Sequence, residues 1–253
     1  MSGSEQPWYS EFFNYDFLNL YGKSLDPART AQEVDFMIAT LGLTENDRIL
    51  DLCCGQGRHS LELSRRGFKI TGQDLSEPLL QRARKDAKAS GLNLQFIHSD
   101  MRCIPFSLEF HAIVNMFSSF GYLESREDDL MVLQQISHAL KPGGKIFLDL
   151  LNREWVLSNH VQDEWRENAN GEFYLEHREF DLAESVSHIT FTVFGKDGST
   201  HESVGHHIRL YSLPELIGML KSKGLYFDRC YGGFDGEPYS MNSRRMIVVA
   251  GKE

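Results

Sequence analysis

Hydrophobic and polar positions along the chain follow two patterns, one typical of helices and one typical of strands. Thr30 opens a helix with apolar residues at helical spacing, and Gly42 is placed to end it. From residue 48, short apolar runs alternate with amphipathic segments. We expect helices at 59–66, 78–89 and 127–140, and strands at 48–54, 69–75, 94–100, 112–117 and 145–151. This alternation predicts an α/β fold, with a mostly parallel sheet and helices on both faces.

The pattern changes after residue 152. Three segments alternate apolar and polar residues without helices between them, at 173–181, 186–194 and 203–211. Gly195-Lys-Asp-Gly198 between two of them is a hairpin turn signal. A helix at 213–223 and strands at 225–231 and 245–250 follow. We therefore predict an inserted antiparallel cap subdomain at 153–210, between the two parts of the main domain at 30–152 and 211–253.

Aromatic residues are concentrated at the beginning of the chain. They are Trp8, Tyr9, Phe12, Phe13, Tyr15, Phe17 and Tyr21. A helix of this composition packs on the domain, and the same helix can also cover a ligand. We assign residues 1–29 to an N-terminal helical lid in which the two roles are compatible.

Composition and charge exclude several classes of protein. Of the 253 residues, 41% are hydrophobic and 25% charged, which is ordinary for a globular domain. The formal net charge of −10 disfavours nucleic acid and anionic membranes as partners. The chain begins without the features of a signal peptide, and no apolar run approaches a membrane span. The four cysteines and the histidines lack metal-ligand spacing, so we expect no metal. Because the sequence shows no secretory features, we also expect a cytoplasmic protein with reduced thiols.

The stretch from residue 49 to 60 reads Ile-Leu-Asp-Leu-Cys-Cys-Gly-Gln-Gly-Arg-His-Ser and predicts a ligand loop. Gly55 and Gly57 let the backbone approach a ligand, and the next helix presents free N–H groups at the carboxyl edge of the sheet. A dinucleotide fingerprint would place a third glycine where Ser60 stands. The carboxylate of Asp51 would repel a pyrophosphate but attract an ammonium or sulfonium group.

Two more acidic residues end the next two predicted strands. Asp74 can accept hydrogen bonds from both hydroxyls of a ribose, and it would repel a 2′-phosphate. Asp100 can accept from the exocyclic amine of adenine, with Met101 packed on the ring. Any one of these acidic residues, taken alone, is most simply explained as the cap of a helix or a loop. Acids at three successive strand ends, beside a glycine turn, instead predict a cofactor site.

These motifs resemble those of the class I S-adenosylmethionine (SAM) dependent methyltransferases, over roughly 30–150 and 212–250. Segments 51–57, 72–76, 99–101 and 140–145 are similar to the family's first motif, second motif, adenine motif and the turn before its fifth strand. Cys53 is a departure, because the family usually has its first glycine there. The resemblance implies a Rossmann-like doubly wound sheet of seven strands, the last antiparallel, with SAM as cofactor. The implied cofactor-binding residues are Asp51, Cys53, Gly55, Gly57, Asp74, Leu75, Asp100, Met101, Asn115 and Phe117.

Segments 100–102 and 115–123 resemble the small-molecule branch of that family, which includes N-methyltransferases of nucleotide-linked amino sugars. The expected function is methyl transfer to nitrogen or oxygen of a small molecule. Such displacements depend mainly on alignment of donor and acceptor, so the family implies no universal catalytic residue. The candidates for binding the acceptor are Ser118, Tyr122, His207 and Arg209.

Two alternatives to this function remain open on the sequence. One is a NAD- or nucleotide-sugar-linked oxidoreductase, which Ser60 and Asp51 weaken, and the other is a SAM-binding module without turnover. The sequence also leaves open what covers the apolar face of the predicted cap. This face, which carries Ile189, Phe191 and Val193, either packs over the acceptor site or joins a second subunit as a homodimer.

Overall fold

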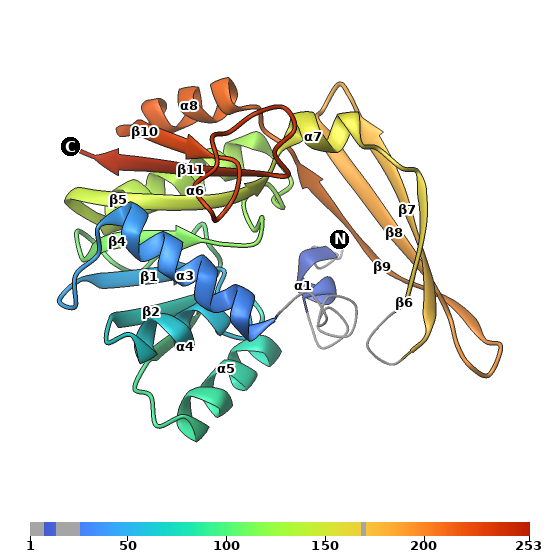
Figure 1. Ribbon diagram of the computed structural model, residues 1–253, viewed down its shortest axis with the longest axis horizontal. Coiled ribbons are helices and arrows are strands. Elements are labelled where there is room, and N and C mark those ends of the chain that lie inside the picture. Colours follow the sequence, from blue (N-terminus) through green and yellow to red (C-terminus); the bar gives the residue numbers. More distant parts are fainter. Residues whose placement is uncertain (1–7, 14–25, 168–170) are drawn as a thin grey trace, which may run out of the picture.

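The computed structural model describes residues 8–13, 26–167 and 171–253. These residues form two separate β-sheets, one of seven strands in the order β10-β11-β5-β4-β1-β2-β3 and one of four strands in the order β6-β7-β8-β9. Figure 1 shows the two sheets beside each other, with the short helix α1 (Trp8–Phe12) between them.

The large sheet confirms the predicted seven-stranded topology. Neighbouring strands β1 to β5 pair in parallel, whereas β11 runs antiparallel to both β5 and β10. The strands are β1 (Arg48–Leu52), β2 (Lys69–Asp74), β3 (Gln95–His98), β4 (Phe110–Asn115), β5 (Leu140–Leu151), β10 (Leu225–Tyr231) and β11 (Arg245–Lys252). The fifth strand is longer than predicted, because β5 begins at Leu140 and includes the Lys-Pro-Gly-Gly segment that was predicted to be a turn before it.

Helices cover both faces of the large sheet, and the alternation along β1 shows why. Leu50 and Leu52 pack into a core shared with α6 and α8, whereas Ile49 packs into a second core with α3 and α4. The helices are α3 (Pro27–Leu41), α4 (Arg58–Arg65), α5 (Glu77–Ala89), α6 (Arg126–Ala139) and α8 (Leu213–Ser222). Helix α3 begins before the predicted Thr30, because the Asp26 side chain caps it and Pro27 occupies its first turn. Among the described helices, none is both long enough and apolar enough to cross a membrane.

The small sheet is antiparallel throughout. It consists of β6 (Asp163–Glu167), β7 (Phe173–Asp181), β8 (Val186–Phe194) and β9 (Thr200–Arg209). The predicted hairpin turn joins β8 to β9, where the Gly195 N–H donates to the carbonyl of Ser199 at 2.8 Å. The structure adds two elements that the sequence pattern did not predict, the helix α7 (Arg153–Ser158) and the edge strand β6.

Helix α1 covers the apolar face of the small sheet. Phe12 stacks on Phe191 of β8, with ring centroids 6.2 Å apart, and Tyr174 and Val193 complete the cluster. The face that carries Ile189, Phe191 and Val193 is therefore covered by this chain's own N-terminal segment. The helix of the predicted lid spans only Trp8–Phe12 in the described residues, and Tyr15, Phe17 and Tyr21 lie outside them.

Candidate functional site

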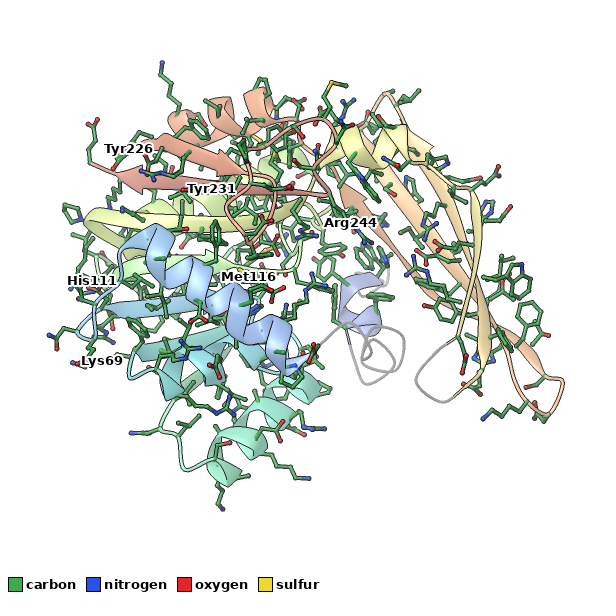
Figure 2. All side chains as sticks on the ribbon, in the orientation of Figure 1. Lys69, His111, Met116, Tyr226, Tyr231 and Arg244 are labelled. Atoms are coloured by element: carbon green, nitrogen blue, oxygen red, sulfur yellow. The ribbon has the colours of Figure 1, made fainter. Side chains whose placement is uncertain are left out.

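A pocket opens at the carboxyl edge of the large sheet, on the side of the small sheet. In Figure 2, Met116 and Arg244 lie toward the small sheet, whereas Lys69 and His111 lie at the opposite edge of the large sheet. Tyr9 and Phe13 form part of the pocket wall, so the N-terminal segment covers it. Many of the residues predicted to bind ligands also line the pocket: Cys53, Gly55, Asp74, Leu75, Asp100, Met101, Phe117 and Tyr122.

Hydrogen bonds join the glycine turn to the acid that ends β2. The Gly55 N–H donates to Oδ2 of Asp74 at 2.7 Å, and the Ser76 N–H donates to Oδ1 at 2.8 Å. Burial raises the pKa of Asp74, and these backbone donors oppose that effect. Cys53 has a φ of 62°, and its Sγ lies 3.6 Å from Sδ of Met101. The turn therefore holds one carboxylate in a fixed orientation beside an apolar wall.

Asp100 is paired with a residue that sequence reasoning did not single out. Its Oδ2 accepts from Nη2 of Arg102 at 2.7 Å, and its Oδ1 accepts from Nε at 3.0 Å. The same guanidinium donates to Asp128 at 2.9 Å and to the hydroxyl of Tyr9 at 3.5 Å. Arg102 thus connects the acid of the pocket to α1. The only sequence signal for this role was its place in the Asp-Met-Arg segment.

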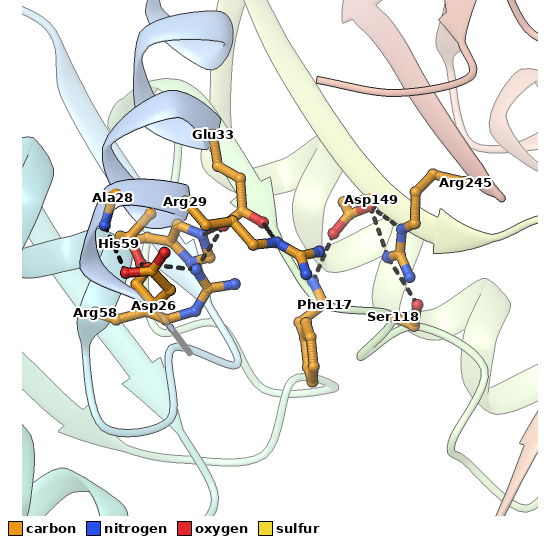
Figure 3. A network of polar contacts seen from close by, with 11 residues as sticks. Asp26, Ala28, Arg29, Glu33, Arg58, His59, Phe117, Ser118, Asp149 and Arg245 are labelled. Carbon is orange, nitrogen blue, oxygen red and sulfur yellow. Dashed lines mark hydrogen bonds and ion pairs between the residues drawn. The ribbon is translucent and has the colours of Figure 1, made fainter. Parts of the chain in front are cut away.

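A second missed group surrounds Glu33 of α3, whose side chain is 2% exposed. It accepts from Arg58 Nη1 at 2.5 Å, pairs with His59 Nε2 at 2.9 Å and accepts from Arg29 Nε at 2.9 Å. Burial alone would raise the pKa of Glu33, but the His59 hydrogen bond and the Arg58 charge lower it to about 2. Arg58 lies over the ring of Phe117, 5.7 Å from its centroid. Figure 3 shows how this network fixes the beginning of α4.

Three of the residues predicted to bind the cofactor lie outside the pocket wall. Asp51 is 1% exposed and accepts from the Ser60 hydroxyl at 2.5 Å. Asn115 is also buried, and its amide donates to the carbonyl of Leu52 at 3.0 Å. Gly57 has a φ of 78° at the N-cap of α4. These three residues support the glycine turn on the side away from the pocket, because β1 and β4 are covered on both faces of the sheet at this point.

The loop after β4 brings only part of its predicted residues to the pocket. Ser118 is 4% exposed, and its Oγ accepts from Arg245 at 2.9 Å, so it faces away from the pocket, whereas Ser119 and Tyr122 line it. A Cβ at Gly121, whose φ is 105°, would lie 2.4 Å from the carbonyl oxygen of Arg209. The loop therefore packs directly against β9.

His207 and Arg209, which were predicted to line the acceptor site, are not among the residues that line this pocket. The ring of His207 instead packs 4.7 Å from that of Trp8. The alternation along β9 turns His206 to the buried face, where its ring lies 6.0 Å from that of Tyr122. Burial lowers the pKa of His206 to about 3, so its imidazole is neutral at physiological pH.

Other chemistries have few candidates in the described part of the chain. No group of three or more His, Cys, Asp or Glu side chains there is arranged to hold a metal ion. The four cysteines are free thiols. The pocket at the edge of the large sheet is thus the candidate site with the clearest ligand chemistry.

Comparisons with known proteins point to one family. Residues 49–144 match a family model described as a methyltransferase domain. The putative methyltransferase YqeM of Bacillus subtilis (strain 168) is 28% identical over 240 residues, 93% of this chain and 96% of that protein. The dTDP-3-amino-3,4,6-trideoxy-alpha-D-glucopyranose N,N-dimethyltransferase of Streptomyces venezuelae is 28% identical over 228 residues, 88% of this chain and 92% of that protein. A crystal structure of an S-adenosylmethionine-dependent methyltransferase from Clostridium acetobutylicum ATCC 824 has a TM-score of 0.78 at 18% identity, covering 94% of this chain and 96% of that one.

Proposed function

This chain belongs to the SAM-dependent methyltransferases, and we propose that it methylates the amine nitrogen of a small molecule bound beside Ser119 and Tyr122. The relative from Streptomyces venezuelae supports a small amine acceptor, because its name describes an N,N-dimethyltransferase of a nucleotide-linked amino sugar. The net charge of −10 also favours a small acceptor over a nucleic acid.

The residues present in the pocket fit SAM. Asp74, oriented by Gly55 and Ser76, offers a carboxylate to the ribose hydroxyls, and Met101 offers an apolar surface to the adenine. Asp100 retains acceptor capacity on Oδ2, which has one hydrogen-bond partner in the described structure. When bound, SAM supplies a methyl group that its sulfonium already activates for displacement. The task left to the protein is alignment and the exclusion of water.

The observation that carries the choice of nitrogen is the lack of a poised base among the described residues that line the pocket. Asp74 is held by the N–H groups of Gly55 and Ser76, Asp100 is paired with Arg102, and His59 is bonded to Glu33. Burial raises the pKa of Tyr122 well above its usual range, so its hydroxyl stays protonated. A hydroxyl acceptor needs a base in the transition state, whereas a neutral amine attacks with its own lone pair and can lose its proton afterwards to water.

Aromatic walls favour the same acceptor. Tyr9, Phe13, Phe117 and Tyr122 all line the pocket. Aromatic faces attract an ammonium or sulfonium charge within about 6 Å of the ring centroid. Such a site stabilises the methylammonium that forms when an amine is methylated.

The oxidoreductase alternative is not favoured, since the matched family model is a methyltransferase domain. Ser60, which replaces the third glycine of a dinucleotide fingerprint, is buried against Asp51. A cytoplasmic location and a homodimer stay predictions.

The test of the proposal is a panel of matched acceptors. Pairs of small molecules that differ only by an amine or a hydroxyl at one position, including nucleotide-linked sugars, are incubated with SAM, and release of the demethylated product is measured. We expect turnover of amines, and less than threefold loss of it in Tyr122→Phe, because no base is removed. Preferential turnover of hydroxyl compounds, or a loss of 100-fold or more in Tyr122→Phe, would contradict the proposal, because a general base contributes about 10²–10⁴-fold.

A further inference from the structure

Two consecutive residues at the pocket have an unusual backbone conformation. Phe117 and Ser118 have φ angles of 61° and 62°, in the left-handed region that favours glycine. Side chains other than glycine are strained there, so the surrounding structure must hold them. The conformation has a consequence for the pocket, because it places the Phe117 ring in the wall and turns Ser118 away from it.

An ion pair behind the loop makes the contacts that hold this conformation. Asp149 of β5 accepts from the Phe117 N–H at 2.9 Å through Oδ2, and its own carbonyl accepts from the Ser118 N–H at 2.9 Å. Arg245 of β11 donates to Oδ1 of Asp149 at 2.7 Å through Nε and to Oγ of Ser118 at 2.9 Å through Nη2. The side chains of Asp149 and Arg245 are only 3% and 15% exposed.

The register of the sheet explains why these two residues meet. Asp149 lies opposite Ile247, so Arg245, two residues earlier on β11, points to the same face. Figure 3 shows Phe117 between two charged groups, with Glu33 and Arg58 on one side and Asp149 and Arg245 on the other.

We infer that Asp149 and Arg245 are positioning residues, which hold the Phe117 ring as a wall of the SAM pocket by fixing the left-handed conformation of residues 117 and 118. The pair does not line the pocket and acts through Phe117. Burial of an ion pair is costly unless additional hydrogen bonds complete it, and here the loop backbone and the Ser118 hydroxyl provide them. The inference rests on the proposed function in one respect, that SAM occupies this pocket.

A double-mutant cycle on SAM affinity tests the inference. Asp149→Asn and Phe117→Leu are each expected to weaken SAM binding about tenfold in titration calorimetry. If Asp149 acts through Phe117, the combined variant binds SAM no more than about threefold more weakly than Phe117→Leu alone. Multiplication of the two effects, to about 100-fold, would overturn the inference. Arg245→Lys is the milder second variant, since lysine keeps the charge but lacks the planar, spaced donors with which Arg245 contacts Asp149 and Ser118 together.

Glu176→Gln is the matched control. Glu176 pairs with Arg178 in the small sheet at 2.7 Å, with side-chain exposures of 6% and 17%, much like those of Asp149 and Arg245. The control should lower the melting temperature while leaving SAM affinity unchanged. Equal weakening of SAM binding by Glu176→Gln and Asp149→Asn would reduce the role of Asp149 to general stability.

Amide hydrogen exchange separates this inference from the proposed function. In the protein without ligand, exchange at residues 117 and 118 should become at least tenfold faster in Asp149→Asn and Arg245→Lys, and stay unchanged in Glu176→Gln. Unchanged exchange in folded Asp149 and Arg245 variants would overturn the inference. If the wild-type protein fails to bind SAM, the proposed function fails, whereas the exchange measurement still decides whether the pair fixes the loop.

Discussion

Cys53 combines a side chain with a backbone conformation that suits glycine. Its φ of 62° lies in the left-handed region, at the position where the resembling family usually has glycine. For an ordinary residue this conformation costs roughly 1–2 kcal/mol, which the contact of Sγ with Met101 partly offsets. The sequence therefore departs from the family motif here, while the backbone keeps a conformation that glycine adopts without strain.

The positive φ of Cys53 predicts that the protein tolerates glycine at this position but is destabilised by valine. Cys53→Gly should change the free energy of unfolding by less than about 1 kcal/mol, because relief of strain offsets the greater entropy of the unfolded chain. Cys53→Val should lower it by more than about 2 kcal/mol, since a β-branched residue is a genuine outlier at positive φ. Chemical denaturation of both variants measures the difference. A Cys53→Val protein as stable as Cys53→Gly would argue against the conformation.

Asp129 of α6 makes stability depend on pH. Its side chain is fully buried, and burial raises its pKa from 3.8 to about 6, although the Tyr211 hydroxyl donates to it at 2.6 Å. Because the folded pKa is the higher one, the favourable contribution is complete below the unfolded pKa and is lost as the pH rises through about 6.

Asp129→Asn, which cannot ionise, should therefore gain stability relative to the wild type as the pH increases. The expected gain between pH 4.5 and 8 is about 2 kcal/mol, measured by urea denaturation of both proteins at each pH. A difference between the two proteins that does not change with pH would show that Asp129 keeps an ordinary pKa.

At the residue scale, the sequence singled out pocket residues where the signal was local. Asp74 and Asp100 were singled out because each ends a predicted strand, and both line the pocket. Glu33 and Arg245 were missed, because their partners lie 25 and 96 residues away along the chain. A charged residue in an amphipathic helix or at a strand end gives no sign of such a partner.

Helices and strands with a clear hydrophobic pattern were predicted from the sequence, whereas short elements without such a pattern were not. The central strands β1, β4, β5 and β11 of the large sheet were recognisable because each carries a run of buried apolar residues, as expected of strands covered on both faces. Strand β6 reads Asp-Glu-Trp-Arg-Glu, and α7 has six residues, so neither carries a period that a sequence pattern could detect. Strand β6 owes its form to its pairing with β7, and α7 begins at the side-chain cap that Asn152 provides.

Helix α1 joins the small sheet to the pocket through Trp8. The Trp8 ring packs 4.7 Å from His207 of β9 and 5.3 Å from Tyr122 of the pocket loop. Trp8→Ala should therefore loosen the cover of the pocket and speed dissociation of SAM about tenfold or more, as measured by stopped-flow fluorescence. Trp165→Ala is the matched control, because Trp165 is 59% exposed on β6 and should leave the dissociation rate unchanged. Similar dissociation rates in both variants would contradict a covering role for α1.

At the scale of the whole molecule, the two sheets have different relations to the pocket. The glycine turn and the acidic strand ends belong to the large sheet. Within residues 8–13, 26–167 and 171–253, the small sheet reaches the pocket through α1 and the loop that packs on β9. The fold of the large sheet followed from the sequence because each strand and helix is a local pattern. The place of α1 between the sheets did not, because its aromatic residues could equally have packed elsewhere on the domain (Figure 1).

SAM binding beside Asp74 is the premise of the methyltransferase function proposed for this chain. Titration calorimetry of the wild type with SAM, its demethylated product and NAD tests this most directly, together with Asp74→Ala and with Asp86→Ala on α5 as a control outside the pocket. We expect binding of SAM and its product but not of NAD. Loss of two hydrogen bonds to the Asp74 carboxylate should cost about 3 kcal/mol, or roughly 100-fold in SAM affinity, and the control should bind normally. Tight binding of NAD without a SAM signal, or full SAM affinity in a folded Asp74→Ala protein, would contradict the account.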